Sequence, residues 1–186
     1  MRERLILEKS ALLIPVMVLL FGAGKIIAAF LLASLLHEIG HLLAIRCFSG
    51  KVRTLRLSFT GAEICADVRG GYAREAVISL MGPAASFAAA ILLAGWGFYT
   101  VAGASFLLGV LNSMPVLSLD GGRALKNLLA LTPLGLESRT VVRVISAAAS
   151  ALLIAAGIYV FWKTTVNISL LVLGIFTFLT QWKEPA

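Results

Sequence analysis

SLLHEIGHLLA (residues 34–44) places two histidines and a glutamate in an almost wholly apolar run, and these are the only two histidines in the chain. Residues four positions apart share one face of an α-helix, so His37 and His41 can both reach one ion. Glu38 lies beside them and can contact a water molecule on that ion. The pattern H-E-x-x-H is typical of zinc-binding helices. It predicts two nitrogen ligands, an oxygen ligand still to be found and an open fourth position.

The composition indicates that this helix lies in a membrane. Of the 186 residues, 60% are hydrophobic and 13% are charged, whereas soluble domains are about 45–50% apolar and about 25% charged. We therefore expect an integral membrane protein, without a cleaved signal peptide, and exclude a soluble zinc protease. Two histidines on one helix face often form hydrogen bonds within the protein and bind no metal. Three ionisable residues within an apolar helix are costly, however, and are typical of functional sites.

The predicted fold class is an all-α polytopic membrane protein with about six transmembrane helices and a small β-hairpin between spans two and three. A transmembrane helix needs about 20 apolar residues. Six apolar segments are candidates, at residues 11–24, 26–45, 76–100, 102–118, 141–161 and 166–181. The hairpin is predicted where VRTLRLSF (52–59) and AEICADV (62–68) alternate apolar and polar residues. We expect a single domain, residues 1–186, without a second soluble domain.

The distribution of positive charge predicts the orientation. With six spans, only Lys25 and Lys163 of the 16 lysines and arginines lie on one side of the membrane. Since positively charged loops stay in the cytoplasm, both termini and the zinc motif are expected on the cytoplasmic side. The net charge of +7 then belongs to residues that contact anionic membrane lipid. No nucleic-acid partner is expected.

Asp120 is the best candidate for the missing oxygen ligand. Besides Glu38 it is the only acid inside or at the end of an apolar segment. Pro115 should break the helix that precedes it, and the glycines at 121–122 allow a sharp turn and a close approach of the chain to the metal. An aspartate here can also cap the following helix. We favour ligation, because the spans that carry both motifs end on the same side of the membrane.

Asn112 and the stretch GPAASF (82–87) are the remaining features of interest. The amide of Asn112 can stabilise a developing oxyanion or form a hydrogen bond between two helices, and the sequence does not decide between these roles. In GPAASF, Gly82-Pro83 should loosen the helix, and the small residues that follow permit close packing against a neighbour. We interpret this stretch as a packing face rather than as part of the chemistry.

Three stretches, in this order, resemble the site-2 protease family of intramembrane zinc metalloproteases: HEIGH (37–41), GPAASF (82–87) and NSMPVLSLDGG (112–122). The last corresponds to the family pattern N-x-x-P-x-x-x-L-D-G-G. The resemblance covers nearly the whole chain. Within the family, the sequence is most similar to the branch of the stage IV sporulation protease, which implies a bacterial cell membrane. No CBS or PDZ domain is expected in this chain.

The resemblance implies one Zn²⁺ per chain, with His37, His41 and Asp120 as its ligands and Glu38 as the catalytic residue. Ser86 departs from the family, because many relatives have asparagine at this position. The expected activity is hydrolysis of peptide bonds in a single-span or membrane-tethered protein substrate, with a regulatory membrane partner as a further candidate. Two alternatives stay open: a catalytically inactive zinc-binding membrane adaptor, and a metal transporter. The single compact site and the absence of further histidines argue against transport.

Overall fold

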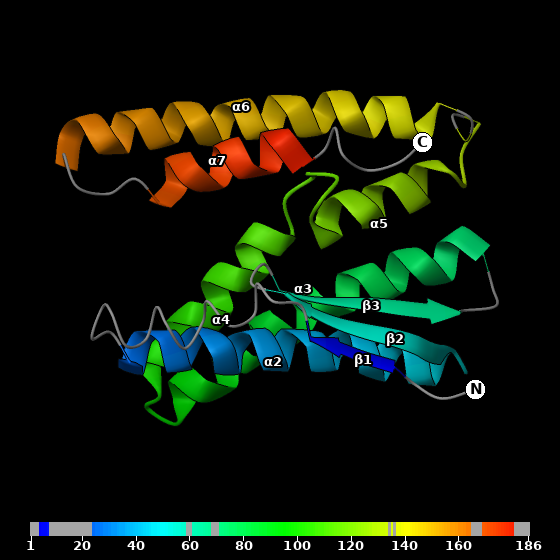
Figure 1. The fold of residues 1–186 in the computed structure, drawn as a ribbon, viewed down its shortest axis with the longest axis horizontal. Coiled ribbons are helices and arrows are strands. Elements are labelled where there is room, and N and C mark those ends of the chain that lie inside the picture. The colour runs from blue at the N-terminus through cyan, green and yellow to red at the C-terminus, as the bar shows by residue number, and fades with distance from the viewer. Residues whose placement is uncertain are drawn as a thin grey trace. The chain divides into compact units, whose positions relative to one another are not determined.

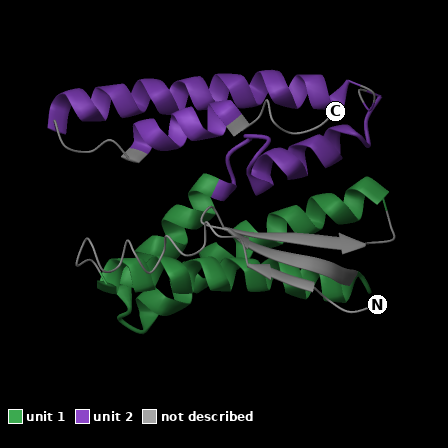
Figure 2. Cartoon of the chain, viewed as in Figure 1, with its two compact units in different colours: residues 1–111 green, residues 112–186 purple. Residues whose placement is uncertain are grey.

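The computed structural model describes residues 4–7, 24–58, 61–67, 71–133, 135, 137–164 and 169–180. In chain order its elements (Figure 1) are β1 (Arg4–Leu7), α2 (Gly24–Cys47), β2 (Lys51–Ser58), β3 (Gly61–Asp67), α3 (Gly71–Gly95), α4 (Tyr99–Asn112), α5 (Asp120–Leu129), α6 (Ser138–Thr164) and α7 (Ser169–Thr180). The chain divides into two compact units, Met1–Leu111 and Asn112–Ala186 (Figure 2). Each unit is described by itself below.

Three of the described helices are long and apolar enough to cross a membrane. These are α2, α3 and α6, with 24, 25 and 27 residues. At 1.5 Å per residue, each exceeds the roughly 30 Å of a bilayer's hydrocarbon core. The apolar helix α4 has 14 residues and α7 has 12, so neither reaches that length as a straight helix.

The predicted count of six spans is therefore wrong for the described part of the chain. The expected spans at 26–45, 76–100 and 141–161 correspond to α2, α3 and α6. Those at 102–118 and 166–181 correspond to the short helices. The first expected span, 11–24, lies outside the described residues except for Gly24. In the segment at 102–118, helix α4 ends at Asn112, three residues before Pro115, so apolar composition alone overestimated the length of the continuous helix.

The predicted class, all-α with a two-stranded hairpin, also needs correction. Strands β2 and β3 pair antiparallel, and β1 pairs parallel with β2, so the sheet has three strands in the order β1-β2-β3 (Figure 1). In the register of the parallel pair, the backbone of Leu5 is the partner of that of Leu55. The third strand comes from a segment far away in the sequence. Local alternation of apolar and polar residues contains no information about such a long-range parallel partner.

Small residues bring the first unit's helices close together. A Cβ atom at Gly40 of α2 would lie 2.6 Å from the Cβ of Ala85 and would collide with the carbonyl oxygen of Met81, both on α3. One cluster of buried apolar residues in this unit consists of Ala29, Ala33 and Ala104, with Val101 packed against it. Small residues allow helices in a membrane to approach closely, where dispersion contacts hold them together.

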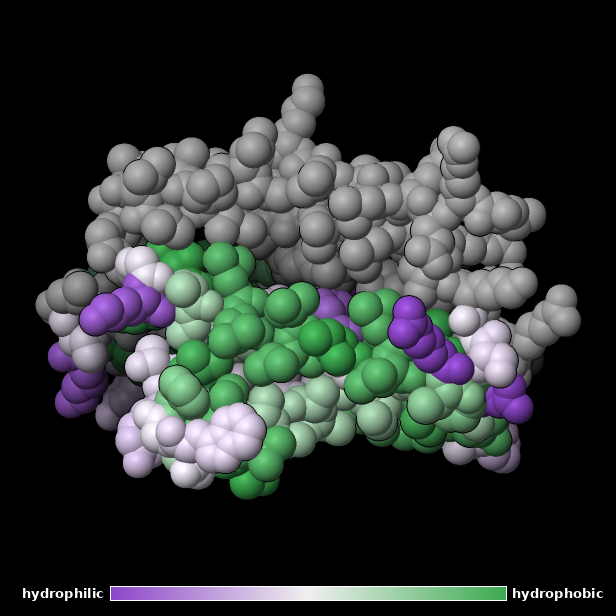
Figure 3. Space-filling model, turned by 90° about the horizontal axis from the view of Figure 1, so that it is seen from below, coloured by the Kyte–Doolittle hydropathy of each residue, from purple (hydrophilic) through white to green (hydrophobic). Residues whose placement is uncertain are grey.

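Large apolar side chains point outward from the long helices. Ile91 of α3 is 74% exposed, Leu152 of α6 is 72% exposed and Trp162 of α6 is 82% exposed. Figure 3 shows one face of the molecule on which apolar side chains form a continuous band, with hydrophilic residues at its two ends. Water-soluble proteins rarely expose so much contiguous apolar surface. An apolar band between polar ends is the surface that a lipid bilayer covers.

Gly40→Ala is expected to lower the free energy of unfolding by about 1–3 kcal/mol, because the added methyl group overpacks the contact between α2 and α3. Gly103→Ala is the matched control, since no atom outside the adjoining backbone of its own helix lies within 4 Å of a Cβ at that position. The control should be neutral or stabilising by up to about 1 kcal/mol through helix propensity. Denaturant unfolding in detergent micelles measures both, and equal stabilities for the two variants would contradict the prediction.

Candidate metal centre

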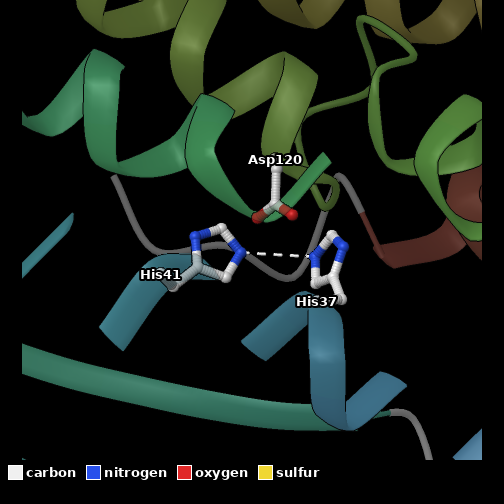
Figure 4. A group of neighbouring side chains, drawn as sticks. All are labelled: His37, His41 and Asp120. Carbon is white, nitrogen blue, oxygen red and sulfur yellow. Dashed lines mark hydrogen bonds between the residues drawn. The ribbon is translucent and has the colours of Figure 1, made fainter. Parts of the chain in front are cut away.

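Two buried imidazoles lie one helical turn apart on α2. His37 is 4% exposed and His41 is 9% exposed. Their Nε2 atoms are 3.3 Å apart, the distance drawn as a dashed line in Figure 4. Two nitrogen ligands at about 2.0–2.1 Å from a tetrahedral zinc ion are separated by roughly 3.3–3.4 Å. The spacing of the two nitrogens therefore fits a shared zinc ion.

Helix α3 contacts the other nitrogen of each ring. Nδ1 of His41 lies 2.8 Å from the backbone carbonyl oxygen of Ile78. A carbonyl only accepts hydrogen bonds, so Nδ1 of His41 donates and its Nε2 is left to act as a ligand. Nδ1 of His37 lies 2.8 Å from Oγ of Ser86. Outer contacts of this kind hold metal-binding rings in their orientation.

Gly82 leaves the space that the two rings occupy. A Cβ atom at this position would collide with Nε2 of His41 and would lie 2.7 Å from Nε2 of His37. Gly82 and Ser86 are one turn apart on α3, and both are buried. The interpretation of GPAASF as a packing face alone was therefore incomplete. Gly82 and Ser86 lie four residues apart in an apolar helix. This spacing is the sequence signal that could have indicated that one face of α3 contacts the histidine rings.

In the second unit, Asp120 is the first residue of α5 and is 9% exposed. Leu119 occupies the N-cap position, and no side chain there forms a capping hydrogen bond. Asp120 is thus the first residue inside the helix and does not occupy the N-cap position. A carboxylate in the first turn is also favoured by the helix dipole.

The backbone before Asp120 folds tightly against the start of α5. Cβ atoms at Gly121 and Gly122 would collide with the carbonyl oxygens of Ser113 and Val116, respectively. The two glycines therefore make room for the preceding loop. The sequence predicts instead that the two glycines allow a close approach of the chain to the metal. Their position next to Asp120 fixes where the helix begins and with it the place of the carboxylate.

Ser146 of α6 binds the non-helical loop that leads to Asp120. The N–H of Leu117 donates to Oγ of Ser146 at 2.8 Å, and the hydroxyl donates to the carbonyl of Pro115 at 3.2 Å. Ser146 is fully buried. Non-helical backbone in a membrane must have its polar groups satisfied by protein or by water in a cavity. One serine thus satisfies a donor and an acceptor of this loop.

His37, His41 and Asp120 form a group that can hold a metal ion. Each residue offers one ligand atom, and these atoms all lie within 4.8 Å of one another; the three side chains are drawn together in Figure 4. All three are buried. Two nitrogens and one oxygen are a common ligand set for zinc in hydrolytic sites. Glu38 follows His37 directly and is partly exposed, as is Asn112 at the end of α4.

Comparison with solved structures finds a similar fold. The chain is similar to the site-2 protease from Methanocaldococcus jannaschii, with a TM-score of 0.73 and 22% sequence identity. The match covers 99% of this chain and 91% of that one. No model of a known protein family matches the chain, and no curated protein matches its sequence. At this level of identity, the likeness establishes the fold.

Ser146→Ala is expected to lower the free energy of unfolding by about 1–3 kcal/mol, because a buried N–H and a carbonyl lose their partner. The matched control is Ser150→Ala, one turn further along α6. Ser150 is also fully buried, and among the described residues its hydroxyl has no hydrogen-bond partner. Its replacement should have little effect or should stabilise the protein. Unfolding in detergent compares the two variants, and a larger loss for Ser150→Ala would refute this role of Ser146.

Proposed function

We propose that this protein is an intramembrane zinc metalloprotease of the site-2 protease type. The observation that carries the proposal is the group of three buried ligand atoms within 4.8 Å of one another, with Glu38 next to one of them in the sequence. The similarity of the fold to a site-2 protease supports it. The proposed reaction is hydrolysis of peptide bonds in membrane-spanning or membrane-tethered protein substrates.

In this proposal His37, His41 and Asp120 hold one Zn²⁺. When bound, zinc lowers the pKa of its water to about 7 and polarises the carbonyl of the scissile bond. Glu38 removes a proton from the attacking water and later delivers it to the leaving nitrogen as a general base and acid. The Asn112 side chain donates a hydrogen bond to the developing oxyanion, and a hydrogen bond between helices stays the alternative for this residue.

The proposed substrate is a single membrane-spanning or tethered segment. The exposed apolar surface of the long helices favours an approach through the lipid. A helical substrate must first be unwound, because its amides are bonded within the helix. The hydroxyl of Ser86 and the carbonyl of Ile78 hold the two proposed histidine ligands in place while that happens. A regulatory membrane partner remains part of the prediction.

The proposed location is a bacterial cell membrane, with the site near the cytoplasm. Arg46 lies in the last turn of α2, and three more basic residues follow it within ten positions, whereas Lys25 alone lies at the other end of this helix. Positive charge is retained on the cytoplasmic side, so the end of α2 that carries His41 faces that way. Cytoplasmic termini and the assignment to the sporulation branch remain predictions from the sequence.

Glu38→Gln is expected to reduce cleavage of a co-expressed single-span substrate by about 10²–10⁴-fold, because an amide cannot accept the proton of water. Zinc content should stay unchanged, since Glu38 is not a proposed ligand. Immunoblotting for the cleaved substrate and metal analysis of the purified protein give the two measurements. Full activity in the variant would exclude Glu38 as the base, and a wild type that binds zinc without cleaving any substrate would favour the inactive adaptor.

Asp120→Ala is expected to weaken zinc binding by more than the roughly 10–100-fold that follows loss of an outer-shell partner. The carboxylate is one of three proposed ligands, and its removal leaves only two nitrogens. Glu137→Ala is the matched control, because Glu137 is an exposed acid outside the group. Competition with a chromogenic chelator measures the affinity. Unchanged affinity in Asp120→Ala would show that the ion, if bound, does not use this residue.

A further inference from the structure

Ser86 has an environment that the proposed reaction does not explain. Its side chain on α3 is fully buried, and its Oγ lies 2.8 Å from Nδ1 of His37. The equivalent nitrogen of His41 faces the backbone carbonyl of Ile78. The two rings therefore differ in how their outer nitrogens are held: one by a side chain that a substitution can remove, and one by the main chain.

A hydroxyl suits this position for a physical reason. When Nε2 of His37 binds a metal, the remaining hydrogen of the neutral ring must be on Nδ1. Oγ of Ser86 can accept that hydrogen bond, because a hydroxyl has two acceptor lone pairs as well as a donor. Since Ser86 is 0% exposed, bulk water does not reach its side chain in the folded protein.

The hydrogen bond of Ser86 does not follow from burial alone. Ser105 and Ser150 are also 0% exposed, yet their hydroxyls have no hydrogen-bond partner in the described part of the chain. Gly82, one turn before Ser86, provides the space in which the rings fit. The same face of α3 thus provides both the room for the rings and the contact that orients one of them.

We propose that Ser86 is a positioning residue, which fixes the orientation and tautomer of His37 so that Nε2 points at the metal. The proposal rests on the proposed function, in which His37 is a zinc ligand. It extends that function by giving a buried side chain on another helix control over metal affinity. Removal of such outer-shell contacts weakens metal binding by about 10–100-fold.

The test compares Ser86→Ala, Ser86→Thr and the matched control Ser105→Ala, in the full-length protein purified in detergent with a tag that lacks histidine. Ser105 is an equally buried serine in the same unit. The first measurement is zinc affinity by chelator competition. We expect a loss of about 10–100-fold for Ser86→Ala, wild-type affinity for Ser105→Ala, and recovery in Ser86→Thr, which keeps the hydroxyl.

The second measurement is nitrogen NMR of the zinc-loaded protein after labelling of histidine with ¹⁵N. The chain has two histidines, so the spectrum contains the signals of two rings. We expect Ser86→Ala to shift or broaden the Nδ1–H signal of His37 while that of His41 stays in place. A general disturbance of packing moves both rings, so this readout separates positioning from a structural role.

The outcomes are distinguishable from failure of the proposed function. If the wild type binds no zinc, the metal centre itself is refuted. If it binds zinc and Ser86→Ala has the same affinity and the same Nδ1–H signal, the role of Ser86 is refuted while the metal centre stands. Equal losses in Ser86→Ala and Ser105→Ala, or a loss in Ser86→Thr as large as in Ser86→Ala, also overturn the inference.

Discussion

The contact between α2 and α3 is the constraint on which the first unit depends. Two imidazoles lie in an apolar setting, where each polar nitrogen needs a partner to offset the cost of burial. Helix α3 supplies these partners through Ser86 and the carbonyl of Ile78. It can do so only because Gly40 and Gly82 carry no side chain at the points of closest approach. Helix packing and the ligand geometry are therefore one feature of the structure.

In the second unit, a carboxylate lies at the start of a helix, directly after a stretch of non-helical backbone. Pro115 cannot donate a hydrogen bond, and the loop that follows α4 needs partners for its other polar groups. Ser146 supplies one donor and one acceptor, and the glycines after Asp120 let the loop lie directly against α5. In each unit a neighbouring helix thus supports the candidate ligands: α3 contacts both imidazoles, and Ser146 of α6 binds the loop before Asp120.

The sequence predicted what local patterns can encode. The apolar run at 26–45 indicated a helix, and α2 covers it. Pro115 indicated a break, and α4 ends at Asn112 before it. The grouping of Asp120 with the two histidines was also predicted. The span count was mistaken because the apolar segment at 102–118 was counted as a span although its helix ends at Asn112. The third strand was missed because its parallel partner is far away in the sequence. The role of Ser86 was missed for the same reason, since its partner is 49 positions away.

The candidate ligands and Glu38 bear on the choice between an enzyme and an inactive adaptor. Structural zinc sites are closed by four protein ligands, whereas catalytic sites have three and leave a position for water. Within the residues that the structure describes, the candidate group has three members, His37, His41 and Asp120. In the proposed function, Glu38, which directly follows His37, is the base that such a water requires. An adaptor that needed only a rigid ion would have no use for this glutamate, so the proposal of catalysis rests on Glu38 rather than on the number of ligands.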